Sequence, residues 1–331
     1  MNESISILLP AKNAESFLHE CLNSILNQSE KDWELLVVDD HSDDRTFETL
    51  KEFHQKDVRI KPLKNKGKGI IDALQTAYSS SQGSFITRMD ADDLMHENKL
   101  STMKSQLLHH GTGHIATSLV KYFAEDGVNE GYQKYEQWLN GLTEKGENFK
   151  DIYKECVIPS PSWMLHRSDI EKIGAFQNLI YPEDYALTFE MYKAGLKVIP
   201  SNQVLHFWRD HENRASRNDP NYADNTFLPL KVKYFLALDH DPNKELILWG
   251  AGKKGKKIAQ LLIDNKTPFK WICNNEKKWN KDVYGVKIKP VKENIKEKQQ
   301  VIVSVANPDE KKNILRSLKN FQPNKDVFLF C

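Results

Sequence analysis

Cysteine is scarce in this sequence. The 331 residues contain four cysteines, Cys21, Cys156, Cys273 and Cys331, and no two of them are closely spaced. Without paired spacing they argue against a disulfide framework and against a zinc site, and they are typical of a reducing compartment. We therefore expect a cytoplasmic protein.

Long apolar runs are lacking as well. None approaches the ~20 residues that a membrane-spanning helix requires. No basic region or cleavage site precedes the apolar residues Ile5–Leu9, so we expect no signal peptide. These absences leave peripheral attachment at the inner face of a membrane open.

A net charge is nearly absent, but only for the chain as a whole, which carries +1. Residues 241–331 hold 20 basic and 10 acidic residues, a net charge of +10, whereas residues 1–240 carry a net charge of −9. Such a split indicates either an anionic partner for the C-terminal part or a lysine-rich, solvated surface.

Apolar and amphipathic stretches alternate over the first hundred residues. Strands are predicted at Ile5–Leu9, Leu35–Val38, Val58–Pro62 and Phe85–Met89, and helices at Ala14–Gln28, Thr46–Gln55 and Gly69–Ser79. Alternating elements of this length predict an α/β fold with a mostly parallel, doubly wound sheet. In such sheets, ligands bind at the carboxyl ends of the strands.

A linker-like stretch at residues 239–243 marks the expected domain boundary. We expect one domain at 1–240 and a small basic domain at 241–331. Within the second, the strand Leu246–Trp249, a glycine turn and the helix Lys256–Ile263 predict a small Rossmann-like βαβ domain. The polar, turn-rich residues 210–225 predict a mobile loop.

Three carboxylates follow the apolar residues Phe85 and Ile86: Asp90, Asp92 and Asp93. So much negative charge at a strand end is unfavourable unless a cation balances it. Oxygen ligands without Cys or His suit a hard cation, Mg²⁺ or Mn²⁺, held jointly with substrate phosphates. The alternative is a solvated acidic turn that caps a helix beginning at Leu94.

A second acidic pair, Asp39 and Asp40, also falls at the end of a predicted strand. Because the carboxyl ends of parallel strands meet at one edge of a sheet, the two acidic groups are expected to lie close together. This coincidence favours an active site at that edge.

Several segments occur in an order that is typical of one enzyme family. They are Pro10-Ala11-Lys12-Asn13, Val38-Asp39-Asp40-His41, Arg88-Met89-Asp90-Ala91-Asp92-Asp93, Pro161-Ser162-Trp163-Met164, Pro182-Glu183-Asp184-Tyr185 and Trp208-Arg209-Asp210-His211, with Ser216 downstream. Over residues 4–216 the sequence resembles the family 2 inverting glycosyltransferases, which have the nucleotide-sugar-binding GT-A fold. One departure is His41, because family members commonly carry glycine there.

The resemblance implies a binding site for a UDP-sugar donor. By analogy with the family, Pro10, Asn13, Asp39 and Asp40 would hold the nucleoside, and Asp90 would face the ribose. The alternative for the first acidic pair is turn and helix-capping chemistry.

The resemblance also implies a Mn²⁺ or Mg²⁺ ion on Asp92, which would neutralise the leaving diphosphate. Arg88 would contact diphosphate oxygens, or it forms a structural salt bridge with a neighbouring Asp. His211 would contact the diphosphate or the metal, or it is structural.

Asp184 is the general base that the resemblance implies, with Glu183 beside it in the donor site. An inverting transfer needs one carboxylate to accept the proton of the acceptor hydroxyl. The alternative for Asp184 is a helix cap. Trp163 and Trp208 would form a wall for the sugar, or they belong to the buried core.

In the C-terminal part, Gly250, Gly252 and Gly255 satisfy the glycine pattern of a dinucleotide-binding turn. That pattern gives a remote alternative function, an NAD(P)-dependent oxidoreductase. The region is only about half of a full Rossmann domain, and no clear acid follows its second strand to hold a ribose. Lys253 and Lys254, at the start of a helix, suit another anion.

The order of the two domains resembles that of the queuosine-tRNA galactosyltransferases. A basic C-terminal domain suits tRNA, because lysine neutralises phosphate charge. Most family 2 enzymes, by contrast, glycosylate envelope glycans or lipid-linked acceptors. The sequence therefore predicts transfer of a hexose to an acceptor that is either a cell-envelope saccharide or queuosine-modified tRNA.

Overall fold

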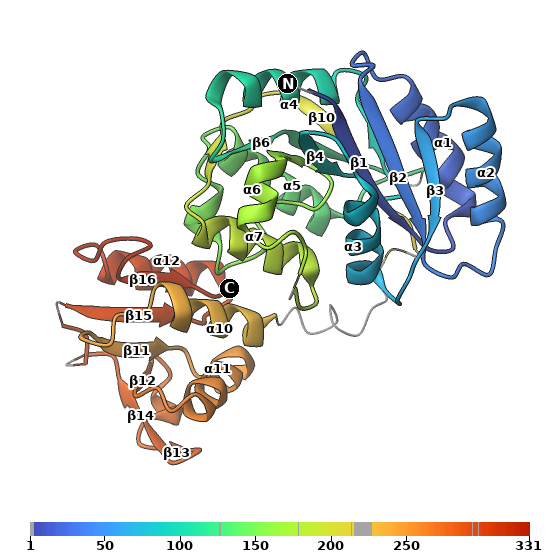
Figure 1. Cartoon of the computed structure of the whole chain (residues 1–331). Coiled ribbons are helices and arrows are strands. Elements are labelled where there is room, and N and C mark those ends of the chain that lie inside the picture. The colour runs from blue at the N-terminus through green and yellow to red at the C-terminus, as the bar shows by residue number, and fades with distance from the viewer. Residues whose placement is uncertain are drawn as a thin grey trace. The chain divides into compact units, whose positions relative to one another are not determined.

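The computed structural model describes residues 3–125, 127–177, 179–212, 214, 227–292, 294–296 and 298–331. Most of the expected mobile loop 210–225, and Ser216 within it, lies outside these residues. The chain forms two compact units (Figure 1). The first contains Met1–Phe149 and Val157–Arg214, and the second contains Lys150–Cys156 and Ala215–Cys331.

The first unit is built on a seven-stranded sheet with the order β3-β2-β1-β4-β8-β6-β9. Its strands are β1 (Ile5–Ala11), β2 (Trp33–Asp39), β3 (Ile60–Lys64), β4 (Phe85–Arg88), β6 (His114–Thr117), β8 (Trp163–His166) and β9 (Lys197–Ile199). Only β8 runs antiparallel to its neighbours β4 and β6. Strand β2 is buried along its whole length, as expected for a sheet covered on both faces. The predicted mostly parallel α/β fold is confirmed.

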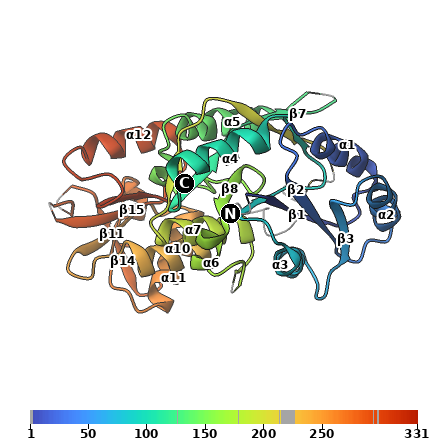
Figure 2. The ribbon, with the colours of Figure 1, turned by 45° about the horizontal axis from the view of Figure 1, so that its top comes forward.

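Helices cover both faces of this sheet (Figures 1 and 2). The helices of the first unit are α1 (Glu15–Leu26), α2 (Thr46–Lys56), α3 (Ile70–Ser80), α4 (Lys99–His110), α5 (Glu130–Thr143), α6 (Arg167–Lys172) and α7 (Glu183–Lys193), and a short 3-10 helix covers Asn148–Asp151. Apolar residues of α1, α2 and α4 form one core with Ile5, Ile7 and Leu9, which alternate along β1. Helix α3 lies on the opposite face, where Leu74 and Ala77 are buried.

A second sheet of three strands has the order β5-β10-β7: β5 (Leu94–Met95), β10 (Val204–Arg209) and β7 (Leu119–Phe123). Leu94 was expected to begin a helix, but it pairs with Phe207 of β10, and α4 begins only at Lys99. This pairing places β10 beside the acidic turn that precedes β5.

Helix α5 covers the outer edge of β7. The Asn140 side chain accepts a hydrogen bond from the Val120 amide (3.0 Å) and donates one to the Val120 carbonyl (2.8 Å). One turn earlier, the Glu136 carboxylate accepts from the Tyr122 amide at 2.6 Å. The side chains of α5 therefore satisfy backbone groups that an edge strand would otherwise leave unpaired.

Replacing Asn140 with Ala should lower the free energy of unfolding by about 1–3 kcal/mol, because it leaves buried backbone groups of Val120 unpaired. Urea denaturation would measure the change. The matched control is Asn23→Ala on the exposed face of α1, expected to change stability by less than ~0.5 kcal/mol. Equal unfolding free energies for the two variants would contradict this role of Asn140.

The second unit contains a six-stranded sheet with the order β13-β14-β12-β11-β15-β16. Its strands are β11 (Glu245–Trp249), β12 (Lys270–Cys273), β13 (Asp282–Val283), β14 (Val286–Pro290), β15 (Gln299–Val303) and β16 (Val327–Leu329), and all but β13 are parallel. Its helices are α10 (Leu228–Leu238), α11 (Lys253–Asp264) and α12 (Pro308–Ser317), with a 3-10 turn at Glu276–Lys278. Helix α12 covers one face and α10 and α11 the other (Figure 2). The predicted Rossmann-like βαβ arrangement is confirmed.

Residues 150–156 belong to the second unit although they lie within the first in sequence. The Tyr153 ring stacks on Phe330 with centroids 5.3 Å apart and meets Phe235 edge-on. Its hydroxyl donates to Asp239 at 2.5 Å. The same contacts place α10 in this unit, although α10 precedes the expected boundary at residue 240.

Within the described part of the chain, none of the helices combines the length and the apolar character needed to cross a bilayer.

Candidate active site

The carboxyl ends of β1, β2 and β4 meet at one edge of the first sheet, because these strands are adjacent and parallel. Pro10 and Ala11 end β1 in register with Val38 and Asp39 of β2. The turn Asp90–Asp93 follows β4 at the same edge. The structure thus brings together the two acidic groups that the sequence places at strand ends.

The loops after β1 and β2 are bonded to each other. The Asn13 amide donates to the Ser42 hydroxyl at 2.9 Å, and the Asn13 side chain accepts from the Asp43 amide at 3.0 Å. Asp39 is fully buried and pairs with Lys64 at 3.2 Å. These bonds give the nucleoside end of the expected site a fixed backbone.

Asp40 is held by the loop after β3. Its carboxylate accepts from Asn65 at 2.6 Å and from the Gly69 amide at 2.9 Å. His41 next to it has a φ of 58°, a left-handed conformation that favours glycine. Its ring Nε2 lies 2.9 Å from the Gly67 carbonyl oxygen, so this histidine also contacts the loop after β3. It does so from a backbone conformation that glycine usually adopts.

Arg88 lies buried between two carboxylates. Its Nε and one terminal nitrogen approach Asp90 Oδ1 at 3.0 and 2.9 Å, and the other terminal nitrogen donates to Glu183 at 2.8 Å. Burial lowers the pKa of Arg88, but the charges of Asp90 and Glu183 raise it more, so the guanidinium stays protonated. The structure places Arg88 in an ion pair that links β4 to the start of α7.

Asp184 lies half-buried in the first turn of α7. Its Oδ1 accepts a hydrogen bond from the Tyr185 amide at 2.7 Å. Burial raises the pKa of Asp184 to about 7, and the adjacent charge of Glu183 adds to the rise. A carboxylate with this pKa can both accept and release a proton near neutral pH.

Asp92 is the most accessible carboxylate of its turn, with a side chain 29% exposed. Its Oδ2 lies 2.9 Å from His211 Nε2. Burial raises the pKa of Asp92, but the hydrogen bond from His211 and the charge of Arg214 outweigh it, so this pKa lies below its ordinary value.

Asp93 is buried, and no helix begins at Leu94, so this residue is not part of a solvated turn that caps a helix there. One of its oxygens faces His206 Nε2 at 3.0 Å, and the other accepts from the Arg209 amide at 2.9 Å. Behind His206, the fully buried Lys99 approaches the ring Nδ1 at 3.1 Å. Burial lowers the pKa of Lys99 to about 7 and that of His206 well below its ordinary value.

The donor atoms near Asp92 fit a divalent cation that the substrate helps to hold. Among the described residues, no group of three or more His, Cys, Asp or Glu could hold a metal by itself. Mg²⁺ and Mn²⁺ commonly bind one or two carboxylates and take their other ligands from water and substrate phosphates. Asp92 supplies such a carboxylate, and the neighbouring His211 has a buried Nδ1 with no partner in the described structure.

Trp163 and Trp208 both lie in packed cores. Trp163 is 1% exposed, and the Trp208 ring stacks on Tyr122 with centroids 5.1 Å apart. The structure thus shows these indoles in the core arrangement that was the alternative to a sugar wall.

The His211 ring packs against the Phe17 ring, with centroids 4.5 Å apart.

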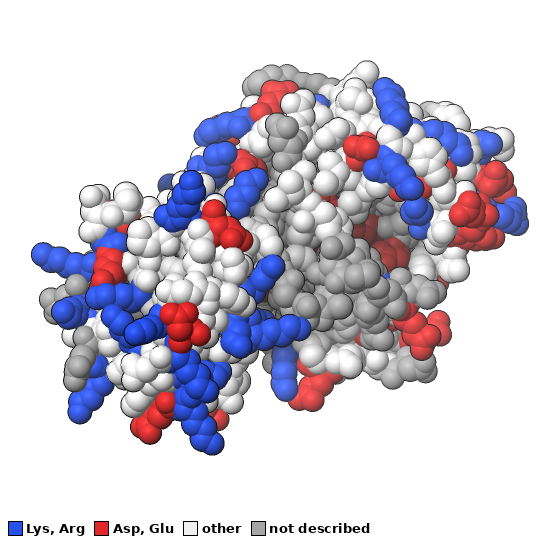
Figure 3. Space-filling model, turned by 90° about the horizontal axis from the view of Figure 1, so that it is seen from below, with Lys and Arg blue, Asp and Glu red and all other residues white. Residues whose placement is uncertain are grey.

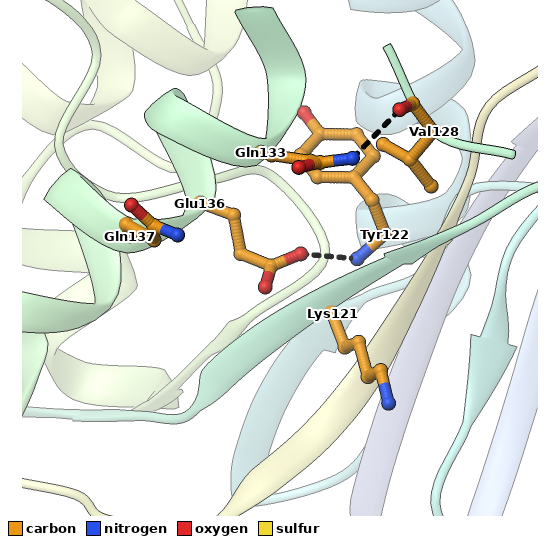
Figure 4. A pocket seen from close by; sticks show the side chains of 6 residues that line it. All are labelled: Lys121, Tyr122, Val128, Gln133, Glu136 and Gln137. Carbon is orange, nitrogen blue, oxygen red and sulfur yellow. Dashed lines mark hydrogen bonds between the residues drawn. The ribbon is translucent and has the colours of Figure 1, made fainter. Parts of the chain in front are cut away.

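A separate cavity of about 300 Å³ lies between β7 and α5 (Figure 4). It is lined by Lys121, Tyr122, Val128, Gln133, Glu136 and Gln137. Figure 4 shows the Glu136 carboxylate directed at the backbone of β7, where it bonds to Tyr122. None of the predicted site residues lines this cavity.

In the second unit, the predicted glycine turn joins β11 to α11. Gly250 has a φ of 125°, and a Cβ on Gly255 would lie 2.2 Å from the Gly250 carbonyl oxygen. Gly252 is the N-cap of α11, and Lys253 and Lys254 open the helix. Gly250 and Gly255 thus allow the turn to pack closely on the helix, whereas a Cβ on Gly252 would meet nothing within 4 Å.

The sequence matches Glycosyl transferase family 2 over residues 6–174, about half of the chain. Glycosyltransferase GlyG of Streptococcus pneumoniae is 31% identical over 228 residues, 66% of this chain and 75% of the relative. An Escherichia coli relative, UDP-Glc:alpha-D-GlcNAc-diphosphoundecaprenol beta-1,3-glucosyltransferase WfaP, is 28% identical over 65% of this chain and 81% of the relative. Glycosyltransferase GlyA of S. pneumoniae is a longer relative. The match has 23% identity and covers 66% of this chain but only 32% of GlyA.

Solved structures share the fold. S. aureus TarS in complex with UDP-GlcNAc superposes with a TM-score of 0.56 at 17% identity, over 78% of this chain and 71% of TarS. A Pyrobaculum calidifontis mannosyltransferase in complex with GDP-Man and Mn²⁺ gives 0.53 at 17% identity, over 79% and 69%. These likenesses confirm the predicted GT-A fold. The match to the family model over residues 6–174 establishes that this chain belongs to glycosyl transferase family 2.

Proposed function

We propose that this chain is a metal-dependent inverting glycosyltransferase that moves a hexose from a UDP-sugar to a hydroxyl of a cell-envelope saccharide. The observation that carries the proposal is the position of Asp184, a half-buried carboxylate in the first turn of α7, next to Glu183 and its ion pair with Arg88. Burial raises its pKa to about 7, which suits a general base. The acceptor class is supported by WfaP, whose name gives a diphosphoundecaprenol-linked sugar as its acceptor.

The donor would bind at the carboxyl edge of the first sheet. The loop from Pro10 to Asn13 and the carboxylates Asp39 and Asp40 would hold the nucleoside, and Asp90 would face the ribose. Mn²⁺ or Mg²⁺ would be held by Asp92, with His211 close by, jointly with the diphosphate. When bound, such an ion neutralises the charge of the leaving nucleoside diphosphate.

Asp184 would accept the proton of the acceptor hydroxyl. The hydroxyl oxygen then forms its bond to the anomeric carbon while the bond from that carbon to the diphosphate oxygen breaks on the opposite face. The Arg88 ion pair contributes by neutralising Glu183, the nearest carboxylate to the base. Without the guanidinium, the negative charges of Glu183 and Asp90 near Asp184 would be uncompensated.

Queuosine-modified tRNA is the second candidate acceptor. The observation that favours it is the basic surface of the second unit: Lys and Arg predominate on the face of this unit that Figure 3 shows. Residues 241–331 would then act as an RNA-binding domain, since lysine contacts to phosphates supply much of the affinity for nucleic acids.

The test is a UDP-release assay across a panel of UDP-sugars with Mn²⁺. Acceptors are GlcNAc-diphosphoundecaprenol, tRNA that contains queuosine and tRNA that lacks it. We expect release to be stimulated by the lipid-linked sugar with one preferred UDP-hexose. Stimulation only by queuosine-containing tRNA would identify that tRNA, and not a cell-envelope saccharide, as the acceptor. If no donor releases UDP under any condition, the proposed activity is contradicted.

A further inference from the structure

Lys99 is a fully buried lysine on the first turn of α4, and its ammonium nitrogen has two partners. One is the Nδ1 atom of His206 at 3.1 Å, and the other is the carbonyl oxygen of Pro161. A lysine nitrogen carries at least two N–H groups whether charged or neutral, so it can donate to both partners in either state.

A lysine ammonium beside Nδ1 favours one tautomer of His206. A lysine that donates to Nδ1 requires that ring nitrogen to be unprotonated, so the proton of a neutral imidazole resides on Nε2. This N–H then donates to Asp93 Oδ2 at 3.0 Å. The Arg209 amide donates to the other oxygen of Asp93, so both carboxylate oxygens are held from different directions.

The second bond of Lys99 closes a circuit. Pro161 follows Ser160, whose hydroxyl lies 3.5 Å from Asp90 Oδ2 at the other end of the acidic turn. A chain of polar contacts thus leaves the turn at one end and returns to it at the other, through Asp93, His206, Lys99, Pro161, Ser160 and Asp90. Asp92, the expected metal ligand, lies within the segment that this circuit spans.

We propose that Lys99 and His206 are positioning residues that hold the turn Asp90–Asp93 in the geometry that binds the metal and the UDP-sugar. The inference rests on the proposed function, because it assumes a metal at Asp92. It adds that the outer two of the three carboxylates are held by buried partners, Arg88 for Asp90 and His206 for Asp93. Asp92, which contacts the partly exposed His211, has the most accessible side chain of the three and is the one we expect to bind the metal.

The first test uses the unaltered protein. Long-range ¹H–¹⁵N spectra of histidine-labelled, full-length protein report which ring nitrogen carries the proton, and the spectrum of His206→Gln identifies the His206 signal. We expect His206 as the neutral Nε2–H tautomer. A proton on Nδ1 in the wild-type protein would overturn the proposal, whatever the variants do.

The second test measures Mn²⁺ affinity, by counting free Mn²⁺ with electron paramagnetic resonance in the presence of UDP. Loss of a residue that bonds directly to a metal ligand typically weakens metal binding ~10–100-fold. His206 and Lys99 act on Asp92 through Asp93, so we expect the lower end of this range, about 10-fold, for His206→Leu and for Lys99→Met. His206→Gln, which keeps an N–H donor, should lie within ~3-fold of wild type. The control His166→Leu removes a histidine outside the circuit, one that packs on Phe85, and should leave Mn²⁺ affinity unchanged.

Melting temperatures in EDTA separate positioning from stability. A purely structural role would lower the melting temperature of His206→Leu and Lys99→Met but leave the Mn²⁺ affinity of the folded protein unchanged, which would overturn the inference. If His206→Leu does not fold, Lys99→Met and the tautomer measurement decide. Failure of the wild-type protein itself to bind Mn²⁺ with UDP would contradict the proposed function instead.

Discussion

Asp184→Asn is expected to abolish glycosyl transfer and leave UDP-sugar binding nearly intact. The amide keeps the size of the side chain but cannot accept the proton of the acceptor hydroxyl. General-base catalysis typically contributes ~10²–10⁴-fold, so kcat should fall by about that factor. Steady-state kinetics and calorimetric titration with the UDP-sugar would measure the two effects separately.

The pH dependence of the wild-type enzyme provides a second check on this residue. The base works as the carboxylate, and its pKa is raised to about 7, so activity should be lost as the pH falls through about 7 and should level off above it. Glu190→Gln, in the last turn of the same helix, serves as the control and should retain both activity and pH profile. A weakened affinity for the donor in Asp184→Asn, with an unchanged kcat, would remove Asp184 from the role of base.

Asp92→Ala should remove the dependence of UDP binding on Mn²⁺. In the wild-type protein, Mn²⁺ should strengthen UDP binding, because the ion would join the carboxylate to the diphosphate. Without the carboxylate, the increase in UDP affinity that Mn²⁺ produces should be lost. The loss should exceed ~10–100-fold, the effect typical of removing a residue that only supports a metal ligand. Calorimetric titration of UDP with and without Mn²⁺ would measure it.

The control for this variant is Asp57→Ala. Asp57 forms an ion pair with Arg59 between the end of α2 and the start of β3, so it precedes the amino end of a strand and is not at the carboxyl ends where the acidic turn lies. In the Asp57→Ala variant, Mn²⁺ should strengthen UDP binding as much as it does in the wild-type protein. If Asp92→Ala also keeps that response, the metal ligand must be sought elsewhere in the acidic turn.

The sheet of the first unit could be predicted because its signals are local. The apolar runs that form β1, β2 and β4 lie within a few residues of their predicted positions, and the acidic residues follow them directly. Parallel alternation then places Asp39 and Asp90 at one edge without knowledge of any long-range contact. The second sheet was harder, because β5 has two residues and exists only through its pairing with β10.

The contact between Lys99 and His206, behind the acidic turn, could not be predicted for a related reason. Lys99 and His206 stand 107 positions apart, and a single lysine in a sequence normally indicates an exposed side chain, whereas a single histidine is more often structural. Only the pairing of β10 with β5 brings His206 beside Asp93. Likewise, tryptophan is enriched both in cores and at sugar sites, so the residue type alone could not decide between them for Trp163.

The placement of Tyr153 has a consequence for the history and the engineering of this chain. Because residues 150–156 fold with the second unit, the polypeptide passes between the two units three times rather than once. A single recombination event near residue 240 could not have exchanged the second unit cleanly, since Phe330 would be replaced while its partner Tyr153, together with Phe235 of α10, stayed behind. The two units are therefore expected to have been inherited together, and a minimal catalytic fragment would require Tyr153 to be redesigned for contact with water.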